Sequence, residues 1–291
     1  MKILVGVAHA FSPKEGSAYS SQNTEKKETK ERALFKATIG NIIRHSKKQW
    51  VHASLGNRGK IVTRQFETNI DQDLTIRLYV AKGANLAESL PKHKKLEVVE
   101  IELENKMELP LFATRHLLEH CEDYDIVGYI EDDISIEDEY FFQKLRCIQK
   151  DIPSEYAVIP HRCEKIEEYG EVILSGDPDG GRPDLFWATG EKITYNWPTG
   201  SITFYRATNP HSGCFFLSKE QANIVKGYWQ ERNWESTFTL SGPLEQAASG
   251  RLLSTLKIMK TIPEDYKFLK VVHNDCLWKR HEFEITNDRG T

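Results

Sequence analysis

The fold of this chain is decided by the stretch Asp125-Ile126-Val127-Gly128-Tyr129-Ile130-Glu131-Asp132-Asp133-Ile134. It is typical of a largely apolar strand that ends in three adjacent carboxylates. Crowded acidic side chains repel one another, and the repulsion is relieved by water, by hydrogen-bond donors or by a cation. Because side chains alternate along a strand, we expect Glu131 and Asp133 on one face and Asp132 on the other. This arrangement suits a divalent metal ion that has few protein ligands.

The same acids also allow a structural interpretation. Residues 133–138 can form an acidic loop that caps a helix predicted over residues 137–150, and Ser135 and Asp138 suit that role. The cluster, however, directly follows an apolar strand, and open α/β sheets bind their ligands at the carboxyl ends of their strands. We therefore favour a metal and phosphate site.

Length and composition restrict the class of protein. A chain of 291 residues predicts one large α/β unit, or a core with a substantial insertion. Its 39 basic and 43 acidic residues are scattered, so we expect no extended nucleic-acid surface. Residues 2–7 are too short for a signal-peptide core, and no segment reaches the length of a membrane span, which predicts a cytoplasmic protein. The five widely spaced cysteines favour reduced thiols.

Strand and helix patterns alternate along the first half of the chain. We expect strands over residues 2–8, 74–80 and 96–103, and helices over residues 25–46 and 110–121. This order predicts a mostly parallel sheet flanked by helices. Aromatic, Gly and Pro residues between 169 and 210, including the Gly176–Pro183 turn sequence, predict short hairpins, followed by a strand over 214–217 and a helix that Ser218 caps. We expect a single domain, with residues 1–150 as its nucleotide-binding half and residues 151–291 as its acceptor-binding half.

The segment Tyr129–Phe141 resembles the strand, acidic motif and helix of GT-A nucleotide-sugar glycosyltransferases, in the Glu-Asp-Asp form of the DxD motif found in some N-acetylglucosaminyltransferases. The resemblance implies a Rossmann-like GT-A fold with a hairpin-rich insertion on the acceptor side. It also implies a glycosyltransferase of the hexosyltransferase type that uses Mn²⁺ or Mg²⁺ and a nucleoside-diphosphate sugar, with UDP favoured by family frequency. By position, Asp133 would bind the metal, whereas Glu131 and Asp132 would contact water, ribose or sugar.

A second segment, Ser241–Leu252, resembles the part of inverting GT-A enzymes that supplies the acid which activates the acceptor. The resemblance implies that Glu245 is the general base. A sugar hydroxyl is a poor nucleophile near neutral pH, and a carboxylate that takes its proton assists the attack. In the alternative interpretation, Glu245 only occupies the first turn of a surface helix after Pro243, where an acid is stabilising.

A third match is the apolar strand Lys270–Asp275, which contains a late histidine. It is similar in position to the histidine that completes the metal shell in many GT-A enzymes, so His273 would be the second metal ligand. An imidazole suits manganese better than magnesium. His281 is the competing candidate for the same role.

The remaining candidates are contacts to donor and acceptor. The resemblance places Ala8, His9 and Phe11 at the nucleotide base, although His9 and Phe11 are equally suited to packing. It places Gly213 at the donor sugar, where a glycine lets the backbone approach closely; the alternative is an ordinary buried strand with a kink. Arg115 is a candidate for a phosphate or base contact. Trp197 and Trp234 are candidates for stacking on an acceptor sugar, although most tryptophans are packing residues.

Two other function classes stay open at this point. A sugar-nucleotide nucleotidyltransferase also combines an α/β sheet with acidic metal ligands, but it would carry a Gly-rich basic loop after the first strand, of which Ser12–Gly16 is a poor version. A noncatalytic sugar-binding protein of the same fold is the other alternative.

Overall fold

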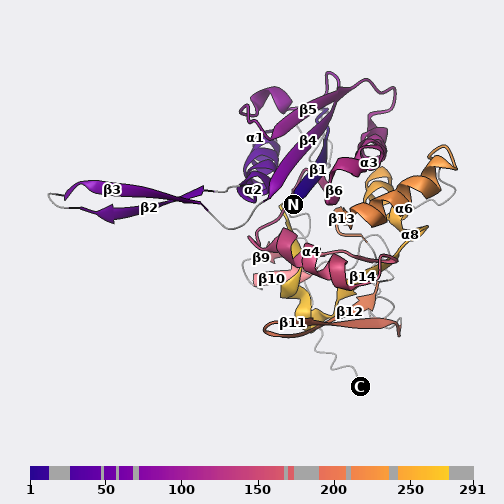
Figure 1. The fold of residues 1–291 in the computed structure, drawn as a ribbon. Helices are drawn as coiled ribbons and strands as arrows, with labels where there is room; N and C mark the ends of the chain where they lie inside the picture. The colour runs from indigo at the N-terminus through magenta and orange to yellow at the C-terminus, as the bar shows by residue number, and fades with distance from the viewer. Residues whose placement is uncertain are drawn as a thin grey trace.

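The computed structural model describes residues 1–12, 27–46, 49–56, 59–67, 72–166, 170–173, 190–207, 211–235 and 242–274. Its central sheet has five strands in the order β13-β6-β1-β4-β5 (Figure 1). These strands are β1 (Lys2–His9), β4 (Asp73–Ala81), β5 (Leu96–Ile101), β6 (Ile126–Glu131) and β13 (Cys214–Ser218).

The central sheet is parallel except at one edge. β1 pairs in parallel with β4 and with β6, β4 pairs in parallel with β5, and β13 joins β6 as the antiparallel strand. β6 is buried along its whole length, as a strand covered on both faces must be. The prediction of an α/β fold with a mostly parallel sheet is therefore confirmed.

Helices cover both faces of this sheet. One face packs against the consecutive helical segments α1 (Lys27–Arg32), η2 (Ala33–Ile39, π-helical) and α2 (Gly40–Arg44), and against α4 (Phe141–Asp151). The other face packs against α3 (Leu109–Glu119) and α6 (Lys219–Gln230). Ser218 begins α6 as a capping box, as its sequence predicts.

Two smaller sheets extend the fold. One has the order β10-β9-β15-β7 and the other β11-β12-β14-β8. Their strands are β7 (Ile134–Ser135), β8 (Tyr156–Val158), β9 (His161–Ile166), β10 (Gly170–Ile173), β11 (Lys192–Trp197), β12 (Gly200–Arg206), β14 (Lys257–Thr261) and β15 (Lys270–His273). The β11–β12 hairpin agrees with the predicted hairpin region, whereas the Gly176–Pro183 turn lies outside the described residues.

Short helical turns complete the described elements. They are η4 (Ala87–Ser89), η5 (Lys106–Glu108), η6 (Cys121–Asp123), α7 (Pro243–Glu245), η7 (Gln246–Gly250, π-helical), α8 (Arg251–Leu253) and η8 (Pro263–Phe268). In the part of the chain that is described, no helix has both the length and the hydrophobicity needed to cross a membrane.

The structure differs from the sequence expectations at two places. The acidic strand ends at Glu131, and Asp132 and Asp133 form a turn before β7, so strand alternation does not govern all three acids. The helix expected from residue 137 begins at Phe141, and Asp138 accepts a hydrogen bond from the backbone N–H of Tyr140 at 2.9 Å. Asp138 thus supports the start of the helix, whereas Glu131, Asp132 and Asp133 lie at the end of β6 and in the turn that follows it.

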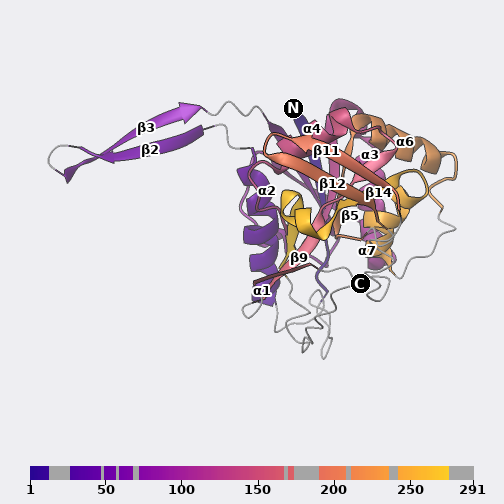
Figure 2. The same cartoon turned by 90° about the horizontal axis from the view of Figure 1, so that it is seen from below.

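A hairpin that the sequence analysis did not predict projects from the body of the molecule. It consists of β2 (Gln49–Leu55) and β3 (Ile61–Glu67), which pair only with each other among the described strands. Two views at right angles show it as a ribbon that stands away from the other elements (Figures 1 and 2). We call it the arm.

His161 makes the stability of this fold sensitive to acid. Its Nε2 lies 2.7 Å from the carbonyl oxygen of Thr261, and burial, followed by the charge of Lys260, lowers its pKa to about 3. A histidine whose pKa is lowered by folding contributes stability above its unfolded pKa of 6.5, and this contribution is lost as the pH falls from 6.5 towards 3.

We expect His161→Gln to flatten the pH dependence of unfolding, because glutamine still donates a hydrogen bond to Thr261 and does not titrate. Between pH 7 and pH 4 the parent should lose on the order of 3 kcal/mol more of its free energy of unfolding than the variant. Urea unfolding at the two pH values measures the difference. Parallel profiles for parent and variant would show that His161 is not the titrating group.

Candidate metal and nucleotide site

The three acids lie where two neighbouring parallel strands end. Ala8 of β1 is the backbone partner of Glu131 of β6, and His9 follows at the end of β1. The carboxyl ends of parallel strands form the ligand-binding edge of α/β sheets. The structure therefore brings five of the sequence candidates together here: Ala8, His9, Glu131, Asp132 and Asp133.

Asp132 is held between a histidine and a lysine. Its Oδ2 lies 2.5 Å from Nδ1 of His9, and its Oδ1 accepts a hydrogen bond of 2.6 Å from Nζ of Lys30. Nε2 of His9 accepts a hydrogen bond from the backbone N–H of Leu86 at 3.1 Å, so the proton of the neutral ring lies on Nδ1 and points at Asp132. Thr38 donates to the carbonyl oxygen of Asp132 at 2.9 Å. These contacts tie the helix of residues 27–44 to the strand ends.

Asp133 faces His273. Nε2 of His273 lies 3.6 Å from Oδ2 of Asp133, and Nδ1 lies 2.7 Å from Oε1 of the buried Glu164. A carboxylate behind a histidine fixes the orientation of its ring, an arrangement typical of histidines that bind metals. Both nitrogen atoms of Asn274 donate to the carbonyl oxygen of Asp133, at 2.7 and 2.8 Å. Oδ1 of Asp133 has no hydrogen-bond partner among the described residues.

Glu131 is buried beside a glycine with a left-handed backbone. Its N–H donates to the carbonyl oxygen of Gly213 at 2.8 Å, and Gly213 has φ of 66°. A Cβ at position 213 would lie 3.0 Å from Oε2 of Glu131, so only glycine fits without strain. Nε2 of His211 lies 3.8 Å from Oε1 of Glu131, which accepts no hydrogen bond from the described residues.

The charges of these groups depend on one another. Burial, and then the charge of Asp133, raises the pKa of Glu131 to about 8, although the guanidinium of Arg162 and the ring of His273 oppose this. Burial alone would raise the pKa of Asp133, but His273 and Lys30 hold it well below its usual range. Burial alone would lower the pKa of His273, yet Asp133 and Glu164 raise it to about 9. Asp133 and His273 therefore each stabilise the charged form of the other.

The described residues fit a metal ion that has few protein ligands. They contain no group of three or more His, Cys, Asp or Glu side chains arranged to hold a metal. Asp133 and His273 nevertheless face each other, and the unpaired Oδ1 of Asp133 is an orphaned buried oxygen that a cation would satisfy. Lys30, whose Nζ lies 3.9 Å from Oδ2 of Asp133, is a second source of positive charge.

Glu245 lies within electrostatic reach of this cluster. It ends the short helix α7, is half-buried, and its charge contributes to raising the pKa of Glu131 and of Tyr129. A Cβ at position 242 would lie 2.6 Å from Oε2 of Glu245, so Gly242 leaves the space that the carboxylate occupies. Its position in the first turn after Pro243 also agrees with the structural interpretation.

The other candidates have contacts outside the acidic cluster. Phe11 is buried, and its N–H donates to the carbonyl oxygen of Ala84 at 2.9 Å. Nε of Arg115 lies 2.9 Å from Oε1 of Glu119. The guanidinium carbon of Arg115 lies 5.6 Å from the centre of the Trp234 ring. Trp197 packs edge-on against Phe268, with the ring centres 5.2 Å apart. His281 lies outside the described residues.

The sequence analysis missed several residues that the structure places in the site. They are Lys30, Arg162, Glu164, His211 and Asn274. Arg162 and Glu164 carried a usable signal, because two opposite charges in a strand between apolar segments are expected only where they are paired. The sequence gives no signal for Lys30, because several other lysines lie in or near the same charged helix and nothing distinguishes Lys30 from them.

No protein-family model and no curated protein matches this chain. Among solved structures it overlaps with a 4-diphosphocytidyl-2C-methyl-D-erythritol synthase from Anaerococcus prevotii at 13% identity and a TM-score of 0.38, over 92% of this chain and 95% of that one. It overlaps with GalNAc-T7, solved with UDP, GalNAc and Mn²⁺, at 11% identity and a TM-score of 0.45, over 94% of this chain and 43% of that one. It also overlaps with a mutant of LgtC at 9% identity and a TM-score of 0.35, over 94% of this chain and 87% of that one. Such loose overlaps assign no activity, so we interpret the site from its own geometry.

Proposed function

We propose that this protein is a metal-dependent glycosyltransferase that moves a sugar from a nucleoside-diphosphate sugar to a hydroxyl group of a carbohydrate-type acceptor. The observation that supports this most is the opposition of Asp133 and His273, backed by Glu164, at the carboxyl ends of β1 and β6. In this proposal the pair holds a metal ion at the edge where an α/β sheet binds a nucleotide. Strands of the two sequence halves share the central sheet, which supports a single domain.

Asp133 and His273 would hold the ion, and a divalent cation at this place neutralises the negative charge that develops on a departing diphosphate. Lys30 adds positive charge from the helical side of the site. Gly213 lets the side chain of Glu131 pack closely against the backbone at this edge of the site. His9 orients Asp132, which is then positioned to accept a hydrogen bond from a ribose or sugar hydroxyl.

Glu245 would act as the general base. It takes the proton of the acceptor hydroxyl while that oxygen forms a bond to the anomeric carbon, and the bond between this carbon and the diphosphate oxygen breaks on the opposite side. The reaction therefore inverts the anomeric centre. Support comes from the half-buried position of Glu245 within electrostatic reach of Glu131.

Thermal unfolding with nucleoside diphosphates and nucleotide sugars, each with and without Mn²⁺, tests the proposal. We expect stabilisation by a nucleoside diphosphate that requires Mn²⁺, together with slow hydrolysis of the corresponding nucleotide sugar when no acceptor is present. Stabilisation without hydrolysis of any donor would favour a noncatalytic binding protein.

One observation favours the nucleotidyltransferase alternative. Lys30 contacts Asp132 and lies near Asp133, and an ammonium group beside acidic residues is also suited to stabilising a departing pyrophosphate. Incubation with nucleoside triphosphates and sugar phosphates distinguishes the two reactions, because only a nucleotidyltransferase releases pyrophosphate.

His273→Ala should weaken the affinity for Mn²⁺ while leaving nucleotide affinity in EDTA almost unchanged, because the imidazole would contact the ion and not the nucleotide. Calorimetric titration of Mn²⁺ in the presence of a nucleoside diphosphate measures the first quantity. His120→Ala is a matched control, since His120 is exposed and its Nδ1 lies 2.8 Å from the carbonyl oxygen of His116. Equal Mn²⁺ affinity in parent and variant would transfer the ligand role to His281 or to water.

A further inference from the structure

The described side chains of the arm form no hydrophobic core. The side chains of residues 51–55 and 61–66 are all exposed, on both faces of the two-stranded ribbon. An isolated two-stranded hairpin is marginally stable in water, and a third layer is normally needed to support it. The described body supplies no such layer, because the ribbon stands away from it (Figures 1 and 2). We therefore expect the arm to contact another molecule or a surface.

The most exposed apolar side chains lie at the far end of the arm. Leu55 is 81% exposed and Ile61 is 72% exposed, and the two are direct cross-strand partners next to the turn. Val62 and Phe66, on the opposite face, are also exposed. A flat protein surface would cover one face of a ribbon, whereas apolar residues on both faces and at the tip suit a medium that surrounds the tip.

The arm is basic apart from Glu67 at its base. Residues 47–66 contain Lys47, Lys48, Arg58, Lys60 and Arg64 and no acidic residue, in a chain with a net charge of −4. Basic residues beside exposed apolar ones are typical of elements that bind anionic lipid surfaces. Seven-residue strands extend roughly 23 Å, more than the Debye length of about 8 Å in physiological salt, so the acidic body does not repel a surface that the tip contacts.

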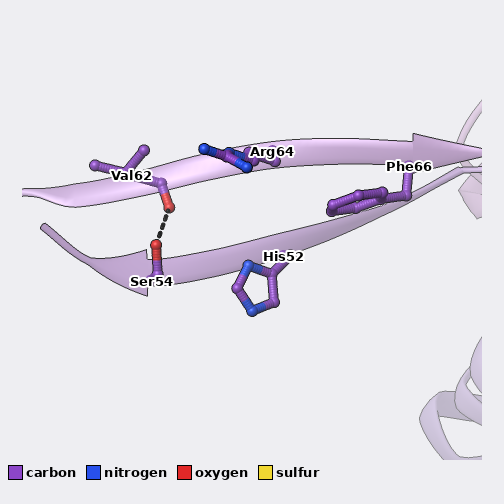
Figure 3. A pocket seen from close by; sticks show the side chains of 5 residues that line it. All are labelled: His52, Ser54, Val62, Arg64 and Phe66. Carbon is purple, nitrogen blue, oxygen red and sulfur yellow. Dashed lines mark hydrogen bonds between the residues drawn. The ribbon is translucent and has the colours of Figure 1, made fainter.

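One face of the arm also carries a groove of about 570 Å³ that both polar and apolar side chains line (Figure 3). His52 and Arg64 are cross-strand partners in it, and the ring of His52 meets that of Phe66 edge-on with the centres 6.4 Å apart. A guanidinium beside an imidazole is suited to binding a phosphate group. The groove thus provides a place for a lipid headgroup between the basic side chains and the apolar tip.

We propose that the arm is a membrane-docking element that inserts Leu55 and Ile61 into the surface of an anionic phospholipid bilayer. Lys60 and Arg64 contact lipid phosphates at the level of the headgroups. This proposal is independent of the glycosyltransferase proposal, because none of its residues belongs to the acidic site.

Flotation of the full chain with lipid vesicles tests the proposal. We expect binding to vesicles of phosphatidylcholine mixed with phosphatidylserine, weaker binding to phosphatidylcholine alone, and a decrease with added salt. The double variant Leu55→Asp/Ile61→Asp should lose roughly tenfold or more in affinity, because two charged side chains then enter the apolar layer. Val98→Asp is the matched control, since Val98 is a 51% exposed apolar residue on β5, and its binding should equal that of the parent.

Two charge-reversal variants test the role of the basic residues in binding. Lys60→Glu should weaken binding to the anionic vesicles, whereas Lys82→Glu, at an exposed lysine of the body, should not. Because every substituted side chain is exposed, thermal unfolding should confirm that all variants fold. Absence of parent binding to either vesicle, or equal binding of the tip variant, would overturn the proposal. A parent that is dimeric by light scattering and becomes monomeric in the tip variant without any vesicle binding would instead assign the arm to a second copy of the chain.

Discussion

Asp133→Asn is expected to abolish the Mn²⁺-dependent binding of a nucleoside diphosphate while the protein remains folded. The substitution removes the negative charge that opposes His273 and keeps the size of the side chain. The loss should exceed the roughly 10–100-fold that follows removal of a residue which only supports a metal ligand. Calorimetric titration with the nucleotide, with Mn²⁺ and with EDTA, measures the effect.

Asp123→Asn is a suitable control for this variant, because Asp123 is an exposed acid on η6 before β6. It should bind nucleotide and metal as the parent does. Full Mn²⁺-dependent binding by the Asp133 variant would disprove the role of Asp133 as a metal ligand. Loss of binding in EDTA as well would indicate that Asp133 supports the nucleotide pocket directly.

Glu245→Gln should reduce turnover by roughly 10²–10⁴-fold, the range typical of removing a general base. Glutamine keeps the shape and the hydrogen-bonding capacity of the side chain but does not accept the proton, so only the chemical step should suffer. Donor affinity should stay nearly constant. Transfer rates and calorimetric donor affinity are best measured on the same preparation.

Glu264→Gln controls for the structural interpretation of Glu245. Glu264 also follows a proline in the first turn of a short helix, η8, and is exposed. Its substitution should leave turnover unchanged. Near-parental turnover in the Glu245 variant would reject the role of base, and a matched loss of donor affinity would make Glu245 a binding residue.

The central sheet could be predicted from sequence because its inner strands β1 and β6 are largely apolar runs and helical patterns separate its strands. β1 and β6 differ from the predicted ranges mainly at their ends, and Ser218 marked the start of α6 correctly. The arm could not be recognised in the same way. Residues 51–55 do alternate between apolar and polar side chains, but residues 61–66 do not, so only one of the two strands carries a strand pattern. The sequence Gly56-Asn57-Arg58-Gly59 between them is a turn signal.

Only part of the candidate site could be predicted from the sequence, and the reason differs from that for the arm. Glu131, Asp132 and Asp133 are adjacent in sequence, and their crowding is visible without a structure. The opposing groups come from distant segments: Lys30 precedes Asp132 by 102 residues, and Glu164 precedes His273 by 109. Only the arrangement of β7, β9 and β15 in one sheet shows which buried acid orients the histidine.

The position of β13 at the edge of the central sheet affects how the chain can fold during synthesis. β6 is apolar and buried throughout, and it presents an unpaired edge until residues 214–218 are available to join it. An exposed edge of this kind is a template for association between chains. Fragments that end before residue 214 should therefore aggregate, and the full chain needs protection of this edge for as long as the ribosome has not delivered β13.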